Sequence, residues 1–217
     1  MALKKEGTLI SDLVREIPAR QFLFKEGDVA KAAFLILKGT VKLIRETASN
    51  SYTVASFGKG DILGEKALLQ KSHYRHSLSA ETVTPTSALE FAFENTQGIE
   101  TQIPDLTSRL LSAACARLDA ANELIKILHT DNPAERFILY LLHFTRCNKK
   151  GFPDISEIPL HPNEICFSTK IDLDCIEKCF RFLIDKKVVV KKENVYFVVD
   201  EKGLSQTPPA LNSYLSK

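Results

Sequence analysis

GDILGEKALLQKSHYRH, residues 60–76, is the most informative stretch of this 217-residue chain. A glycine at position 64 lets backbone amides approach a phosphate closely, and a short helix that begins just after it presents free N–H groups to an anion. Glu65 can accept a hydrogen bond from a sugar hydroxyl, and Arg75 can form a bidentate pair with a phosphate. Taken alone, the pattern fits two interpretations equally well: a phosphate site, or an ordinary Gly-Glu pair with Arg75 facing solvent. The flanking sequence is needed to distinguish them.

Short alternating apolar runs on both sides of this stretch predict β-strands. The runs cover residues 21–24, 33–37, 40–45, 52–57 and 88–93. Turn residues separate them, as at Gly27-Asp28 and Lys38-Gly39. Many short strands with regular glycine punctuation are typical of a small antiparallel barrel or jelly roll. We therefore expect an all-β domain in the first part of the chain.

DLTSRLLSAACARLDAANELIKIL, residues 105–128, lacks glycine and proline and predicts one long helix. At ~1.5 Å per residue this helix would be ~36 Å long, which is more than a β domain of this size needs. Apolar residues recur along it at alternating spacings of three and four, which is a heptad seam. A helix packed on its own barrel is the simpler alternative, but the narrow stripe with two alanines favours dimerisation. The predicted dimer interface consists of Leu111, Ala114, Leu118, Ala121, Ile125 and Leu128.

The remaining residues predict a second, mostly helical domain. Asn132-Pro133 is a helix start, because asparagine can cap a helix and proline suits its first position. Helices are expected over 133–146, 162–167 and 173–186, with a short strand near 155–160. Two β runs joined by Glu193-Asn194 predict a tight hairpin. This order is that of a winged helix-turn-helix, and the tail from Gly203 is expected to be loose.

Composition and short motifs exclude several classes of protein. The 29 Lys and Arg nearly balance the 27 Asp and Glu, so a polybasic protein is excluded. No secretory signal and no apolar run long enough for a membrane span are present, so a cytoplasmic protein is expected. The five cysteines form no C-x-x-C pair, and H-x-x-H at His73 and His76 does not supply the ligands of a cupin metalloenzyme. Since no nucleophile–base pair is evident either, we expect neither a metal site nor an enzyme.

The glycine frame resembles that of cyclic-nucleotide-binding β-rolls. It consists of Gly27-Asp28, Gly39-Thr40-Val41, Gly60-Asp61, Gly64-Glu65 and Arg75. Over roughly residues 15–200 the chain is similar to the CRP/FNR family of bacterial transcription regulators. The resemblance implies an α+β fold with an N-terminal antiparallel β-roll (jelly roll) sensor over 1–104, a dimerisation helix over 105–131 and a C-terminal winged helix-turn-helix over 132–217. It also implies DNA, a second copy of the chain, a small-molecule effector and RNA polymerase as partners, and no membrane.

The resemblance assigns roles in effector binding. In members that bind cyclic AMP the Gly-Glu pair and the arginine hold the ribose and the phosphate, and a small residue follows the arginine. Here His76 stands in that place, and it is bulkier, so cyclic AMP and cyclic GMP stay open as effectors. Iron–sulfur sensing is disfavoured because no cysteine precedes Cys115, whereas His73 and His76 leave haem open. The predicted effector-binding residues are Gly64, Glu65, Arg75, His76, Ser77 and Asn122.

The DNA-binding half departs most from the family pattern. Lys170 stands where the turn usually has glycine, at a cost of roughly 1 kcal/mol. Residues 131–217 carry 13 Lys and Arg against 12 Asp and Glu, a weak basic footprint for a DNA-binding domain. The buried stripe of the second helix is predicted to be Ile176, Cys179, Phe180 and Leu183. The predicted DNA-binding residues are Lys170, Asp174, Lys178, Arg181, Lys191 and Lys192, with Arg146, Lys149 and Lys150 as further candidates for phosphate contacts.

Three functions therefore stay open. The first is a homodimeric regulator in which an effector in the β-roll reorients two recognition helices on DNA. The second is a ligand-sensing protein with a degenerate helix-turn-helix that acts through a protein partner, which the acidic residues Asp174, Glu177 and Asp185 favour. The third is a regulator that senses a small organic effector, which His76 and Ala121 favour.

Overall fold

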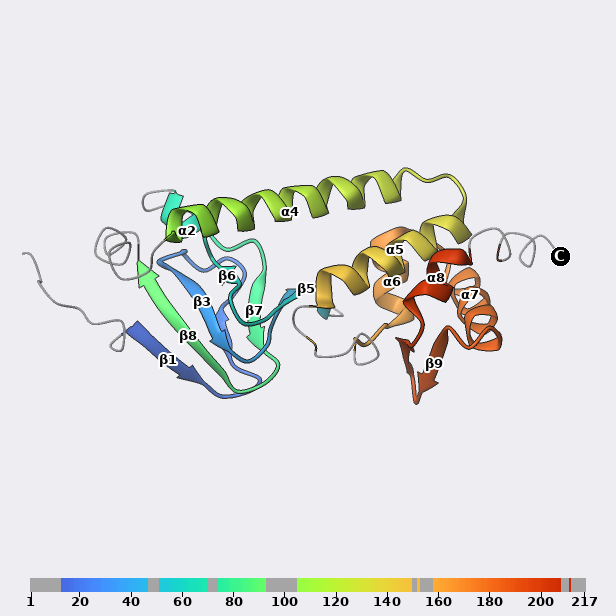
Figure 1. The fold of residues 1–217 in the computed structure, drawn as a ribbon, viewed down its shortest axis with the longest axis horizontal. Coiled ribbons are helices and arrows are strands. Elements are labelled where there is room, and N and C mark those ends of the chain that lie inside the picture. Colours follow the sequence, from blue (N-terminus) through green and yellow to red (C-terminus); the bar gives the residue numbers. More distant parts are fainter. Residues whose placement is uncertain are drawn as a thin grey trace, which may run out of the picture. The chain divides into compact units, whose positions relative to one another are not determined.

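The computed structural model describes residues 13–46, 51–69, 74–92, 105–149, 152, 158–207 and 211. The chain divides into two units, Met1–Ala116 and Arg117–Lys217 (Figure 1). Each unit has hydrophobic clusters of its own. The boundary falls inside the long helix, so the three-part division expected from the sequence stays a prediction.

Two antiparallel sheets form the first unit. One has the strand order β1-β8-β3-β6 and the other the order β2-β7-β4-β5. All pairs within both sheets are antiparallel, and strands distant in sequence are neighbours, which confirms the expected β-roll. The strands are β1 (Val14–Ile17), β2 (Phe22–Phe24), β3 (Ala32–Lys38), β4 (Val41–Glu46), β5 (Ser51–Phe57), β6 (Ile62–Leu63), β7 (Ser79–Thr82) and β8 (Thr86–Ala92), and a short helix α2 (Lys66–Leu69) follows β6.

The sequence does not predict β1, β6 or β7, and β7 shows why. Its first and last residues, Ser79 and Thr82, are polar but buried. Ser79 Oγ accepts from the backbone N–H of Glu26 at 2.9 Å, and Thr82 Oγ1 donates to the carbonyl of Pro18 at 2.6 Å. Because side-chain hydrogen bonds make these hydroxyls acceptable inside the protein, the strand lacks the apolar alternation that would have predicted it.

Strand β3 is the centre of the first unit and is buried on both faces. Phe34 and Ile36 belong to one cluster with residues of both sheets. Leu35 belongs to a second cluster with Leu68 of α2 and Leu106, the first residue of the long helix. A strand covered on both faces reads as a continuous apolar run rather than an alternating one, which explains the sequence Ala-Ala-Phe-Leu-Ile-Leu.

The long helix α4 (Leu106–Leu128) carries the predicted seam on its exposed side. Leu111, Leu118 and Ile125 are 65%, 62% and 54% exposed in the single chain. The two seam alanines are exposed as well. Large aliphatic side chains in one row with this exposure lack a partner among the described residues, which is the state that the dimer hypothesis requires. No helix in the described part of the chain is long and apolar enough to cross a membrane.

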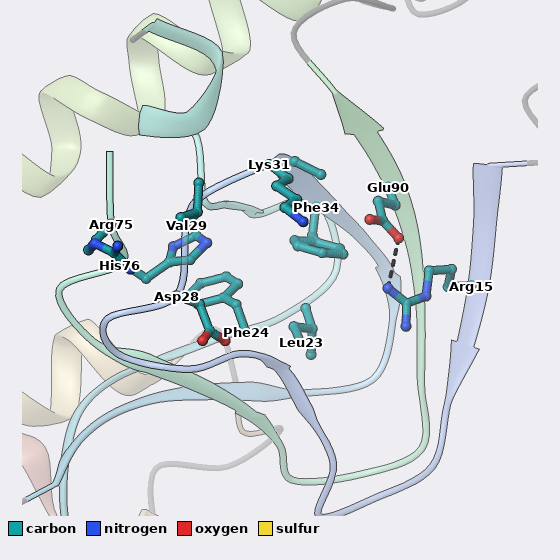
Figure 2. A pocket seen from close by; sticks show the side chains of 11 residues that line it. Arg15, Leu23, Phe24, Asp28, Val29, Lys31, Phe34, Arg75, His76 and Glu90 are labelled. Carbon is teal, nitrogen blue, oxygen red and sulfur yellow. Dashed lines mark hydrogen bonds and ion pairs between the residues drawn. The ribbon is translucent and has the colours of Figure 1, made fainter. Parts of the chain in front are cut away.

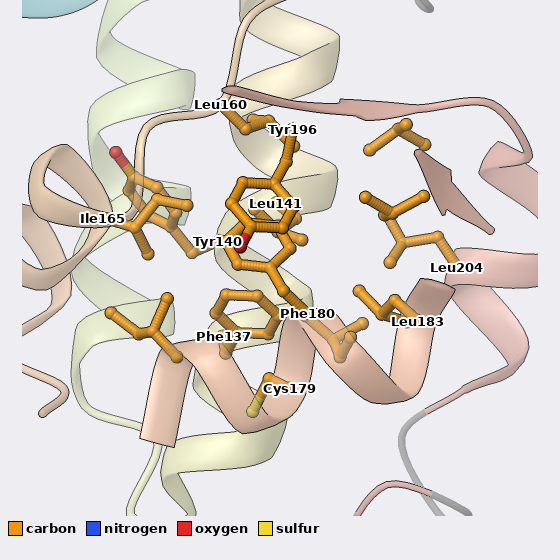
Figure 3. Packing of buried hydrophobic residues seen from close by; sticks show 14 of the residues in the cluster. Phe137, Tyr140, Leu141, Leu160, Ile165, Cys179, Phe180, Leu183, Tyr196 and Leu204 are labelled. Atoms are coloured by element: carbon orange, nitrogen blue, oxygen red, sulfur yellow. The ribbon is translucent and has the colours of Figure 1, made fainter. Parts of the chain in front are cut away.

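Helices α5 to α8 and a hairpin form the second unit together with the end of α4. The predicted stripe of α7 is fully buried, as expected. Figure 3 shows its centre, where the Phe180 ring stacks on Tyr196 at 3.9 Å and meets Phe137 edge-on at 5.1 Å between ring centroids. The elements are α5 (Pro133–Asn148), α6 (Pro162–Thr169), α7 (Leu173–Asp185), β9 (Val189–Lys192), β10 (Val195–Val198) and α8 (Glu201–Gln206).

The beginning of the C-terminal tail is ordered, so the expectation of a loose tail from Gly203 is wrong for the residues described there. Asp200 caps α8 by accepting the backbone N–H of Gly203 at 2.9 Å, and Leu204 is fully buried. One leucine that reaches the core stabilises a helix too short to show periodicity. Most of the strand expected near 155–160 lies outside the described residues, and Leu160 forms an isolated bridge with Tyr196.

The turn between α6 and α7 has the geometry expected from the sequence. Lys170 adopts a left-handed conformation, with φ 57° and ψ 30°, and its N–H donates to the carbonyl of Cys166. Asp172 then caps α7 by accepting the N–H of Asp174 at 3.0 Å. Asn132 caps α5 in the same way, as predicted. Together these caps fix the start of α5, the end of α6 and the start of α7.

Candidate functional site

A cavity of about 480 Å³ lies in the first unit, where β2, the turn after it and the start of β3 face the segment 74–76 (Figure 2). This size is ordinary for a site that holds a small molecule. The lining residues are Arg15, Leu23, Phe24, Asp28, Val29, Lys31, Ala32, Phe34, Arg75, His76 and Glu90.

The cavity combines an aromatic wall with charged side chains. Phe24 and Phe34 lie against each other, with ring centroids 6.1 Å apart. On the opposite side Arg15 and Glu90 form an ion pair at 2.7 Å, so their charges are matched. Lys31 and Arg75 have no acidic partner within the described residues, which leaves two cations of the lining available to a ligand with negative charge.

His76 is the most constrained side chain of the site. It is only 7% exposed, and its ring stacks on Phe24 with 3.7 Å between the ring centroids and 10° between their planes. Its backbone N–H donates to the carbonyl of Asp28 at 2.9 Å, and its carbonyl accepts from Gly27. Burial lowers the pKa of His76, although the carboxylates of Asp28 and Glu65 act in the opposite direction. Burial and stacking therefore fix the imidazole in place.

The structure brings Gly64, Glu65 and Arg75 to the same region as His76. Gly64 has φ +73°, and a Cβ there would lie 2.9 Å from the carbonyl oxygen of Ala32 and 3.5 Å from His76 Cε1. Only glycine fits this position, and the histidine ring already borders it. Glu65 is buried, whereas Arg75 is exposed and donates to the carbonyl of Gly27 at 2.6 Å. The arginine thus holds the turn that begins at Gly27.

The structure does not place two other predicted effector residues at the cavity. Ser77 is exposed, and like Gly64 and Glu65 it does not line the cavity. Asn122 is exposed on α4 within the second unit. Their roles in effector binding stay predictions, and His73 lies outside the described residues.

Sequence reasoning missed the aromatic wall and the ion pair of the cavity. Phe24 and Phe34 read as ordinary strand residues, and only the fold shows that they face the same space as His76. Arg15 reaches Glu90 because β1 pairs with β8 in a register that sets Arg15 opposite Ala88. No short-range pattern in the sequence connects two residues that are 75 positions apart.

A second candidate surface lies on the helix-turn-helix and the hairpin. Asp174, Lys178 and Arg181 recur at spacings of four and three, so they share one exposed face of α7. Arg181 lies 3.6 Å from Glu177, an acidic residue one turn earlier. Lys170 is also exposed, at the C-terminal end of α6. Lys191 and Lys192 are exposed on β9, and their ammonium groups lie over the rings of Tyr196 and Phe197.

The further candidates for phosphate contacts already have acidic partners. Arg146 lies 3.7 Å from Glu123 and 4.0 Å from Glu201, and Lys149 lies 3.7 Å from Glu201. A phosphate would have to displace these carboxylates. Lys150 lies outside the described residues. No group of three or more histidine, cysteine or acidic side chains suited to a metal ion occurs in the part of the chain that the structure describes.

Comparison with known proteins identifies the first unit. Residues 14–99 match the family model of the cyclic nucleotide-binding domain. The chain is 26% identical over 140 residues to the anaerobic regulatory protein of Haemophilus influenzae, covering 64% of this chain and 53% of that protein. It is 24% identical over 140 residues to the fumarate and nitrate reduction regulatory protein of Yersinia pestis, covering 64% of this chain and 55% of that protein. The names of both relatives describe them as regulatory proteins.

The structural comparison extends the likeness to both units. A CRP/FNR-family transcriptional regulator of Thermus thermophilus has a TM-score of 0.64 and 19% sequence identity, with 90% of this chain and 98% of that chain covered. At this identity the likeness concerns the fold. The matches to the two curated relatives span only about half the length of those proteins.

Proposed function

We propose, from the premise that the chain belongs to the CRP/FNR family, that it is an effector-responsive, DNA-binding transcription regulator. In this proposal the first unit binds the effector and the second unit binds DNA. A dimer joined along α4 would transmit the state of the cavity to two recognition helices. RNA polymerase would be a further partner, as the family resemblance implies.

The observation that carries the proposal is the exposed face of α7. A buried stripe with no exposed atoms anchors this helix, while the opposite face presents Asp174, Lys178 and Arg181 to solvent. Capping by Asp172 and the left-handed Lys170 fix the angle between α6 and α7. A rigid helix with a solvated polar face, followed by a hairpin with two lysines, suits major-groove reading with phosphate contacts from the wing.

The two classes of contact are separable by mutation. Alanine at Lys178 removes a side chain proposed to read bases, so it should erase preference among DNA sequences. Alanine at Lys192 removes a phosphate contact, so it should weaken binding to every duplex and lower the salt slope by about 1. Fluorescence anisotropy with a preferred and a scrambled duplex, at several salt concentrations, measures both. If the two variants bind both duplexes as the parent does, this docking is wrong.

We also propose that the cavity holds the effector and that His76 limits which molecules enter. Its ring borders Gly64 and stacks on Phe24, so it occupies space that a phosphate beside Gly64 would need. A cyclic nucleotide would therefore have to displace this ring. A small organic effector with a negatively charged group could instead use the aromatic wall and the cation of Lys31.

Calorimetric titration with cyclic AMP and cyclic GMP distinguishes these effectors when the parent is compared with His76→Ser. Heat of binding with His76→Ser but not with the parent would support the proposal that the His76 ring excludes cyclic nucleotides. Heat of binding with the parent would contradict this exclusion and support a cyclic nucleotide as the natural effector. No heat of binding with either protein would favour a small organic molecule as the ligand of the cavity. Circular dichroism of the variant checks that the β-roll is intact.

A second candidate function is a sensor that acts through a protein partner. The exposed apolar side chains of Phe167 and Leu173 flank the turn of the helix-turn-helix, and Asp174 follows them. An apolar and acidic surface is poorly matched to DNA. If the purified dimer binds no duplex at low salt, this second function becomes the better account.

A further inference from the structure

The second unit contains a chain of three side chains that the proposed function does not use. Cys147 and His143 lie one turn apart on α5, and Glu123 lies on α4. Cys147 Sγ lies 3.6 Å from His143 Nε2, and His143 Nδ1 lies 3.3 Å from Glu123 Oε2. All three belong to Arg117–Lys217, so the arrangement lies within a single unit.

The arrangement suits one tautomer of the neutral histidine. Both ring nitrogens of the buried His143 are engaged. With Nδ1–H donating to the carboxylate, the lone pair of Nε2 faces the Cys147 thiol. Arg146 lies 3.7 Å from the other oxygen of Glu123 and keeps that carboxylate in position. A thiol, an acceptor imidazole and an orienting carboxylate are the parts of an activated nucleophile.

The other cysteines lack this arrangement. No cysteine besides Cys147 has a histidine within hydrogen-bonding distance among the described residues. Cys179 is fully buried, and burial raises its pKa strongly. Cys115 is exposed on α4, and Cys166 and Cys175 are partly exposed. Cys147 combines partial exposure with a base, so it differs in chemistry from its four counterparts.

We propose that Cys147 is a reactive thiol that hydroperoxides oxidise to a sulfenic acid, with His143 as its general base and Glu123 as the residue that positions His143. Sγ attacks one peroxide oxygen, so an S–O bond forms as the O–O bond breaks. The sulfur is oxidised by two electrons and the peroxide is reduced. The thiol proton passes to His143 Nε2 and then to the departing oxygen, which leaves as water when the oxidant is hydrogen peroxide.

Burial raises the pKa of the Cys147 thiol, and the Glu123 carboxylate adds to this effect. The resting group is therefore a neutral thiol, and a preformed thiolate does not explain reactivity here. The proton has to leave while the sulfur attacks, which is the step that a base at 3.6 Å assists.

The chain supplies its own control in Cys166, which is partly exposed like Cys147 and lies away from the seam of α4, but has no histidine within hydrogen-bonding distance among the described residues. Full-length reduced protein is treated with hydrogen peroxide in the presence of dimedone, and peptide mass spectrometry measures the rate of labelling at each cysteine. General-base assistance should make Cys147 react at least about tenfold faster than Cys166. A Cys147 rate equal to or below that of Cys166 would overturn the proposal, because exposure alone would then govern labelling.

Two variants test the roles of the base and of its positioning residue. His143→Gln should slow Cys147 by at least about tenfold and leave the Cys166 rate unchanged. Because His143 is buried, continued protection of Cys179 from the label checks that the unit is folded. If Cys179 becomes labelled, the His143→Gln variant is not correctly folded. Variants of Glu123, which is half-exposed, then test the arrangement instead. Glu123→Gln should slow Cys147 selectively and Glu123→Asp should restore part of the rate, whereas an unchanged rate in Glu123→Gln would refute the proposed arrangement.

Discussion

Substitution of Leu118 by alanine should weaken the proposed dimer strongly. Leu118 is 62% exposed in the single chain, at the middle of the seam. Burying a whole leucine contributes about 1.5–3 kcal/mol, so covering this exposed share contributes about 1–2 kcal/mol. Because a symmetric dimer contains the residue twice, the loss is about 2–4 kcal/mol. The dissociation constant should therefore rise between about 30-fold and 700-fold.

Sedimentation equilibrium over a range of protein concentrations measures this constant. Ser112→Ala is the matched control, because Ser112 is exposed on α4 but outside the seam. The control should dimerise as the parent does. A dissociation constant for Leu118→Ala within about threefold of the control corresponds to less than about 0.7 kcal/mol, and it would refute dimerisation through this seam.

Three further predictions concern the stability of the two units. Folding lowers the pKa of His76, so as the pH falls the unfolded chain takes up a proton on this histidine at a higher pH than the folded chain does. The free energy of unfolding should therefore decrease as the pH drops below about 6.5, by at most about 1.4 kcal/mol per pH unit. His76→Phe should flatten that part of the profile in thermal melts. Phe180→Ala should destabilise the second unit by about 3–5 kcal/mol in urea titrations, since it removes a fully buried ring stacked on Tyr196; a loss below about 1 kcal/mol would contradict the packing. Lys170→Gly should leave the second unit as stable or raise its stability by up to about 1 kcal/mol, because glycine adopts φ 57° without strain, and a clear loss would contradict the left-handed turn.

The sequence predicted the elements whose signals are local. The heptad spacing predicted α4, the capping residue Asn132 predicted the start of α5, and the stripe around Phe180 predicted the buried face of α7. Each of these signals lies within a few turns of one helix, where spacing determines which side chains share a face. The turn at Lys170 was predictable as well, because the resemblance showed where glycine was expected.

Features that depend on contacts between distant residues were not predictable. Strand β7 is stabilised by the hydroxyls of Ser79 and Thr82, and α8 by the burial of Leu204. The position of His76 was known from the motif, but its stacking on Phe24 depends on how β2 meets the segment after α2. Sequence spacing fixes neither the direction of a side chain nor the ring that it meets.

Selection of bound duplexes from random DNA by the purified protein tests the central claim most directly. The account predicts an enriched palindrome whose half-sites lie about one helical turn, roughly 10 base pairs, apart. Addition of a molecule that fills the cavity should change its enrichment. Failure of a folded dimer to enrich any sequence, with and without cyclic nucleotides, would contradict the claim that this chain is a DNA-binding regulator.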